Sequence, residues 1–170
     1  AIVGLLATGG STNHTMHLIA IARAAGISLN WDDFGQLSKA VPLIAKIYPH
    51  GAADVNHFQA AGGMGVLIAE LLNNGLLHED IITVADQRGM NNYRQEPILL
   101  DGKLTWQPVP EESLDKTVLG AVKTPFAESG GLHVMKGNLG RGVSKLSAVA
   151  PEHQIVEAPA VVFDDQEDFL

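Results

Sequence analysis

The chain has 170 residues, of which 46% are hydrophobic and 18% are charged, and its net charge is −8. This is enough apolar material for a sizeable core in a soluble globular protein. The 11 Lys and Arg residues are dispersed, which argues against nucleic acid as a general partner, because phosphate neutralisation needs clustered cations. Without cysteine, these residues can form no disulfide, thiolate nucleophile or cysteine-held metal cluster.

Membrane insertion and secretion find no support in the sequence. No apolar run reaches the ~18 residues of a membrane span, because polar residues 11–14 interrupt the only candidate. A basic segment followed by a cleavage site is also missing from the N-terminus, so we expect a cytoplasmic protein. The chain starts within an apolar run and stops just after an acidic helix-start pattern, which predicts a piece of a longer protein.

The most informative segment, residues 7–14, reads Ala-Thr-Gly-Gly-Ser-Thr-Asn-His. Two glycines break an apolar run, and a helix is expected to follow over residues 12–25, apolar nearly all round and therefore buried. The first N–H groups of a helix lack internal partners and lie at the positive end of its dipole, which favours a bound carboxylate or phosphate. The alternative is a structural helix start with buried caps. The candidate substrate-binding residues are Gly10, Ser11, Thr12, Asn13 and His14.

Further elements follow from capping and breaking residues. Asn30 and Asp33 have capping-box spacing and predict a helix over residues 31–40. An extended segment is expected over residues 43–48, between two prolines. Asn56 as N-cap predicts a helix over residues 57–74, and its three interior glycines indicate close packing more than ligand contact.

The second half of the chain reads as strands and turns. Residues 77–84 fit a short helix or a strand, and Asp101-Gly102 predicts a tight hairpin. Residues 107–125 suggest a crossing segment between domains. Paired strands are expected at 132–136 and 143–147 around a glycine-rich loop, followed by a third strand at 160–163 and a helix capped by Asp164 and Asp165. This predicts a helical part to residue 113, a crossing segment over 114–125 and a β-rich part over 126–170.

Several polar clusters have both a structural and a functional interpretation. His14 and His17 share a helical face, but without a carboxylate beside them they fit hydrogen-bonded core residues better than metal ligands. Asp54 and His57 form a second candidate metal pair, with a capping role for the loop residue as the alternative. Glu70, Glu79 and Asp80 are expected to be solvated charges on helix faces. Lys136, Asn138 and Arg141 lie around a glycine-rich loop whose backbone and cations could hold an acidic group, and solvent-exposed turn residues are an equal alternative.

Three motifs carry a resemblance to a known family. They are the segment of residues 7–18, then Asn-His-Phe-Gln-Ala-Ala-Gly-Gly-Met at 56–64, then Gly-Gly-Leu at 130–132 with Lys-Gly-Asn-Leu-Gly at 136–140. Together they resemble the dihydroxy-acid and 6-phosphogluconate dehydratase family along the whole chain. The His-Thr-Met-His and Asn-His-Phe segments favour its sugar-acid branch, with the branched-chain dihydroxy acids and aldonates as alternative substrates. From a different class, a non-catalytic binding or dimerisation module is the second alternative.

The resemblance implies a homodimeric hydro-lyase with an iron–sulfur cluster, 4Fe-4S or 2Fe-2S, and a nearby Mg²⁺ in well-described members. It implies an α/β fold: the end of a helix-rich α/β/α N-terminal domain, followed by the first strands of a β-barrel-like C-terminal domain. A metal would polarise the departing C3 hydroxyl of a small anionic sugar acid while a base removes the C2 proton. The family's cluster cysteines, catalytic serine and last metal carboxylate match no residue here. No catalytic or metal-binding residue is therefore expected in this segment, which alone should be inactive.

Overall fold

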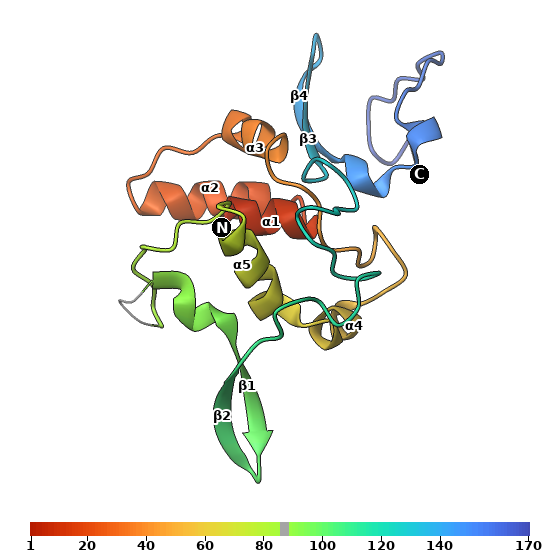
Figure 1. Cartoon of the computed structure of the whole chain (residues 1–170). Helices are drawn as coiled ribbons and strands as arrows, with labels where there is room; N and C mark the ends of the chain where they lie inside the picture. Colours follow the sequence, from red (N-terminus) through yellow and green to blue (C-terminus); the bar gives the residue numbers. More distant parts are fainter. Residues whose placement is uncertain (86–88) are drawn as a thin grey trace.

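The computed structural model describes residues 1–85 and 89–170, so its gap falls within the predicted helical part (Figure 1). Helices gather in the first half of the chain and strands in the second. The helices are α1 (Ile2–Thr8), α2 (His14–Ala24), α3 (Trp31–Ser38), α4 (Val55–Ala60) and α5 (Gly63–Asn73). The strands are β1 (Gln95–Leu100), β2 (Lys103–Pro108), β3 (Leu132–Gly137) and β4 (Gly140–Lys145). Short 3₁₀ helices are η1 (Gly89–Arg94), η2 (Leu146–Ala148) and η3 (Pro151–His153).

The predicted mixture of helix and strand is confirmed at the level of fold class. The strands of the described residues form two separate antiparallel hairpins, β1–β2 and β3–β4, and no closed barrel is present among them. The β1–β2 hairpin projects away from the helices, while β3–β4 rises beside α3 (Figure 1). The barrel-like domain and the proposed boundaries at residues 113 and 126 therefore stay predictions.

The core forms where helices from the first half meet extended chain. Ile44 and Ala45 each donate a backbone hydrogen bond to the carbonyl of Ala7, at 2.9 and 3.1 Å. On its other side the same segment bonds to residues 118–127, for example from Lys46 N–H to the Val118 carbonyl at 2.8 Å. The predicted extended segment at 43–48 is thus confirmed over residues 43–47, and its bonds on both sides place it between α1 and the second half of the chain. The largest fully buried side chains are Phe34, Leu6, Ile44, Leu67, Leu71, Leu119 and Val41.

Helix α3 begins as the sequence predicts. The Asn30 side chain accepts a hydrogen bond from the Asp32 N–H at 2.8 Å, and Asp33 accepts one from the Asn30 N–H at 2.8 Å. This reciprocal arrangement satisfies N–H groups that the first helical turn leaves without partners. The helix ends at Ser38, two residues before the predicted boundary.

The prediction of a buried helix over residues 12–25 is wrong in its burial. Helix α2 forms, but Thr15 is its only buried residue among those described, and Met16 and Ile21 are 56% and 64% exposed. Leu18 and Ile19 pack against the core from one side. Apolar residues all round a helix allow every face of the helix to be buried. Burial also needs protein on each of those faces, and α2 has core residues on one side only.

The predicted helix over residues 57–74 is two helices. Gly62 and Gly63 have φ angles of 118° and 57°, a left-handed conformation that interrupts the helical backbone and separates α4 from α5. The N-cap is Asp54 and not Asn56, because the Asp54 carboxylate accepts from the N–H groups of both Asn56 and His57. Pattern reasoning missed the break because the apolar spacing continues across it.

The second half of the chain agrees with the sequence at its hairpins and differs after them. The turn at Asp101 and Gly102 joins β1 to β2 as predicted. Strands β3 and β4 pair as expected, but Gly137 pairs with Gly140, so the expected loop at 137–142 shrinks to two residues. Residues 77–84 are neither helix nor strand. The predicted strand at 160–163 and the helix after it are also wrong, because no described strand lies beside this exposed segment to pair with it.

Close packing explains one of the helical glycines. A Cβ atom added at Gly65 would lie 2.3 Å from Cγ1 of Val109, so α5 and the chain after β2 touch at this position. Close packing within the chain, the favoured interpretation of these glycines, is confirmed at Gly65.

Substitution of Gly65 by alanine is therefore expected to destabilise the protein by roughly 1–3 kcal/mol, the usual effect of overpacking. Gly4→Ala is the matched control, because Gly4 also lies within a helix but has open space within 4 Å of an added Cβ. It should stabilise by up to about 1 kcal/mol through helix propensity. Urea unfolding of the full-length protein measures both, and equal effects would contradict the packing argument.

A candidate anion-binding turn at the start of helix α2

The candidate turn follows a sharp bend at the end of α1. Gly9 adopts the left-handed conformation with φ 59°, and the N–H groups of Gly9 and Gly10 donate to the carbonyls of Leu6 and Leu5. These bonds close the last turn of α1 and redirect the chain. The two glycines thus act first as a helix stop.

Residues 11–13 then form a helical turn ahead of α2. His14 and Thr15 donate backbone hydrogen bonds to Ser11 and Thr12 carbonyls at 3.0 Å each, and Asn13 N–H reaches the Ser11 hydroxyl at 3.2 Å. Within the described part of the chain, the N–H groups of Ser11 and Thr12 have no hydrogen-bond partner. These two amides are the donors that an anion would contact.

The alternative of a helix start with buried caps agrees with this geometry in part, because the half-buried Ser11 hydroxyl accepts from the Asn13 N–H at 3.2 Å. Asn13 occupies the N-cap position but makes no side-chain cap hydrogen bond, and both Asn13 and His14 are exposed. Ser11 and Thr12 are half-buried. The assignment of Gly10, Ser11, Thr12, Asn13 and His14 as substrate-binding residues stays a prediction that the turn is able to accommodate.

His50 supports the bend, a role that the sequence analysis did not predict. Its Nε2 lies 2.7 Å from the Gly9 carbonyl oxygen, and because a carbonyl only accepts, this nitrogen is the donor. A Cβ atom at Gly9 would approach Nε2 to 2.3 Å, so the absence of a side chain at Gly9 makes room for the ring. The other ring nitrogen, Nδ1, is buried and has no hydrogen-bond partner among the residues that the structure describes. The partners are 41 positions apart in the sequence, so no local spacing could have revealed this contact.

The two histidine pairs play different roles. His14 and His17 have rings 6.3 Å apart in an edge-to-face arrangement, and both are exposed, so the interpretation as core residues is wrong. The His57 Nδ1 and Asp54 Oδ1 atoms lie 2.8 Å apart within the capping box of α4. The backbone hydrogen bond from His57, followed by its side chain, lowers the pKa of the Asp54 carboxyl. This pair therefore caps α4, which is the alternative to a metal pair that the sequence analysis gave.

The acidic residues divide between surface and structure. Glu79 and Asp80 are exposed, as expected. Glu70 is not a solvated surface charge, because its Oε1 accepts from the Val122 N–H at 2.8 Å and from the Asn74 side chain at 3.1 Å. It thereby attaches α5 to the segment that precedes β3.

The cations of the β3–β4 hairpin have an acidic partner within the chain. Lys136 Nζ and Arg141 Nη2 lie 2.6 and 3.0 Å from the same oxygen of Asp32, whereas no contact of the Asn138 side chain is seen among the described residues. Two interpretations were open for these cations, an acid-binding group and solvent-exposed turn residues. The structure favours the first for Lys136 and Arg141, and the acidic group is the Asp32 carboxylate of α3. Lys136 lowers the pKa of Asp32 through its hydrogen bond, with a smaller contribution from Arg141.

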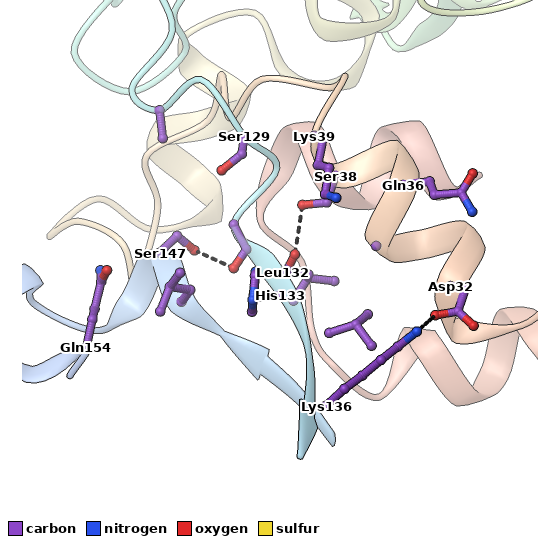
Figure 2. Close-up of a pocket in the computed structure, with 15 residues that line it drawn as sticks. Asp32, Gln36, Ser38, Lys39, Ser129, Leu132, His133, Lys136, Ser147 and Gln154 are labelled. Carbon is purple, nitrogen blue, oxygen red and sulfur yellow. Dashed lines mark hydrogen bonds and ion pairs between the residues drawn. The ribbon is translucent and has the colours of Figure 1, made fainter. Parts of the chain in front are cut away.

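A cavity of about 850 Å³ lies between α3 and the hairpin, and the Asp32–Lys136 ion pair forms part of its wall (Figure 2). Ser38, Ser129, His133 and Ser147 contribute polar groups elsewhere in its lining. A smaller cavity of about 340 Å³ lies beside α5. Neither is lined by any of the five residues of the candidate turn.

Replacing His50 by alanine should destabilise the protein by about 1–3 kcal/mol, because the partly buried Gly9 carbonyl loses its donor. His50→Gln should recover part of this loss, since its amide nitrogen can donate. His78→Ala is the control, as His78 is exposed. Thermal unfolding of the full-length protein checks the order of the three variants, and an equal Tm for the alanine variants would contradict the role of His50.

Comparison with known proteins agrees with the motifs. The model of the dihydroxy-acid/6-phosphogluconate dehydratase N-terminal region matches residues 1–92, and the C-terminal model matches residues 117–170. The phosphogluconate dehydratase of Pseudomonas aeruginosa is 61% identical over 98% of the chain, and that of Escherichia coli K12 is 59% identical over 99%. A dihydroxy-acid dehydratase of Metallosphaera sedula is 37% identical over 96%.

The chain spans only 27–28% of the length of these relatives. In the described part of the chain, no helix is long and apolar enough to cross a membrane. The two family models match in sequence order and together cover most of the chain. The chain belongs to the dihydroxy-acid/6-phosphogluconate dehydratase family.

Proposed function

We propose that the full-length protein is a hydro-lyase that dehydrates 6-phospho-D-gluconate to 2-dehydro-3-deoxy-6-phosphogluconate, the dehydration step of the Entner–Doudoroff pathway. The observation that carries the proposal is that the chain is more similar in sequence to phosphogluconate dehydratases than to the matched dihydroxy-acid dehydratase. Phosphogluconate dehydratases from Pseudomonas, Escherichia, Helicobacter, Rhizobium and Zymomonas are 53–61% identical to nearly the whole chain. The matched dihydroxy-acid dehydratase is 37% identical, which makes that activity the alternative.

Within this function, we assign the turn at residues 10–14 to binding the anionic end of the substrate. The unpartnered N–H groups of Ser11 and Thr12 would donate to a carboxylate or phosphate at the positive end of the α2 dipole. Exposed Asn13 and His14 would provide side-chain contacts from the same turn. Binding energy gained there would orient the sugar acid for bond breaking at C2 and C3.

The residues of this chain do not fit an iron–sulfur cluster or a divalent ion. The sequence contains no cysteine, and the described residues include no group of three or more His, Asp or Glu able to hold a metal. In our proposal, any iron–sulfur cluster and Mg²⁺ of the full-length enzyme therefore take their ligands from outside residues 1–170. The chemistry of those groups is not assigned to any residue described above.

Three further properties belong to the same proposal. We infer a homodimer and a cytoplasmic location for the full-length enzyme, both in line with the family resemblance. The exposed face of α2, with Met16 and Ile21, is compatible with an enzyme in which more protein covers this helix. Binding of nucleic acid is not part of the proposal, because the net charge is −8.

The substrate assignment is tested by assaying the full-length protein on three acids side by side. 6-Phosphogluconate, a branched 2,3-dihydroxy acid and an unphosphorylated aldonate should give 2-keto acids at very different rates. We expect 6-phosphogluconate to have the highest kcat/KM. Turnover restricted to the branched dihydroxy acid would reject the proposal in favour of the alternative.

The binding role of the turn is tested by combining Ser11→Ala with Asn13→Ala in the full-length enzyme. Asn13→Ala removes a proposed side-chain contact, and Ser11→Ala removes the hydroxyl that holds the Asn13 N–H in the turn. Since a hydrogen bond to a charged ligand contributes ~1.5–3 kcal/mol, kcat/KM should fall by at least about tenfold. Arg23→Gln, at the exposed far end of α2, is the control and should leave kcat/KM unchanged. A smaller loss in the double variant would favour a purely structural role for the turn.

A further inference from the structure

The contact between α3 and the β3–β4 hairpin joins the two matched regions of the family. Asp32 lies in the region matched by the N-terminal model, whereas Lys136 and Arg141 lie in the region matched by the C-terminal model. More than 100 residues of sequence separate Asp32 from its two partners. Any interaction between them therefore bears on how one domain is held against the other.

Two cations from different strands converge on one carboxylate oxygen. Lys136 of β3 and Arg141 of β4 are directly opposite each other in the hairpin register, and both contact Asp32 Oδ1. The side chains of Asp32, Arg141 and Lys136 are 42%, 43% and 58% exposed, so water reaches all three. An isolated surface ion pair contributes little to stability. Here one carboxylate contacts two cations that the strand pairing already holds side by side. Three side chains are ordered for two contacts, so the loss of side-chain entropy for each contact is smaller than in two separate pairs.

The same interface contains buried contacts at its other end. The Ser38 hydroxyl, in the last turn of α3, donates to the Leu132 carbonyl at 2.7 Å, and the Gly130 N–H donates to the Ser38 carbonyl at 2.9 Å. Midway along, an added Cβ atom on Gly35 would lie 3.2 Å from Val134. Helix α3 therefore follows the length of β3, attached by Ser38 at one end and by Asp32 at the other.

The large cavity lies along this interface. Asp32 and Lys136 belong to its lining at one end, and Ser38 and Leu132 belong to it further along (Figure 2). If the hairpin moved away from α3, the cavity would widen at the Asp32 end, because the buried Ser38 end is the firmer attachment. Residues of both α3 and the hairpin therefore line one cavity.

We propose that Asp32, Lys136 and Arg141 form an electrostatic clamp that holds the C-terminal domain against helix α3 and sets how far the cavity between them is open. Asp32 is a positioning residue in this proposal and has no role in the chemistry. The cations hold the hairpin through charge, so the clamp loosens when the carboxylate is neutralised or screened. This inference does not depend on which acid the enzyme dehydrates.

Hydrogen–deuterium exchange of the hairpin in the full-length protein tests the clamp. Asp32→Asn keeps the size of the side chain and removes its charge, so exchange of the hairpin amides at residues 132–145 should accelerate about three- to tenfold, the range that loss of a cooperating ion-pair network implies. Glu112→Gln is the matched control, because it removes an equally short exposed ion pair, with Lys116, that does not touch α3. It should leave the hairpin unchanged.

Two further measurements separate the clamp from an effect on α3 alone. About 1 M NaCl, where the Debye length is about 3 Å, should accelerate hairpin exchange in the wild type and have little effect on Asp32→Asn. Lys136→Met combined with Arg141→Gln should accelerate hairpin exchange as Asp32→Asn does, without altering the first turn of α3. Unchanged exchange in Asp32→Asn, an equal response to salt in both proteins, or an effect of Asp32→Asn that the double variant lacks would each overturn the proposal.

Discussion

The extended segment at residues 43–46 is the constraint on which the rest of the molecule depends. Its backbone bonds to Ala7 at the end of α1 and to residues 118–127 from the second half of the chain. Ile44 and Ala45 are completely buried there, so the backbone groups around them need partners within the protein. The hydrogen bonds that these groups make place the end of α1 on one side of the segment and residues 118–127, which precede β3, on the other. The candidate turn follows α1, and the α3–hairpin interface follows residues 118–127.

The two polar features of functional interest differ in how they are built. The turn at residues 11–13 is local: a helix stops at two glycines, another begins, and amides are left over between them. The cluster of Asp32, Lys136 and Arg141 exists only because α3 and the hairpin pack together. His50 links these two kinds of feature, since a residue distant in sequence fixes the local bend at Gly9.

Local rules predicted the elements whose signal lies within a few residues. The capping box of Asn30 and Asp33, the turn at Asp101 and Gly102 and the pairing of β3 with β4 all followed from short-range chemistry. The same rules failed where a partner decides the outcome. Residues 160–163 have the composition of a strand, but a strand needs a neighbour, and none is described beside them.

The sequence alone determined the family, through motifs of fixed order and spacing, and it located the free amides after Gly10, because helix starts and glycine stops are encoded within one or two turns. For Lys136 and Arg141 it left two interpretations open, cations that hold an acid and solvent-exposed turn residues. Tertiary structure decided that the acid is Asp32, that His50 supports the bend at Gly9, and that α2 is exposed in the described structure. The physical reason is that burial and long-range pairing each depend on two surfaces in contact. One segment of sequence specifies only its own surface and not the surface that packs against it.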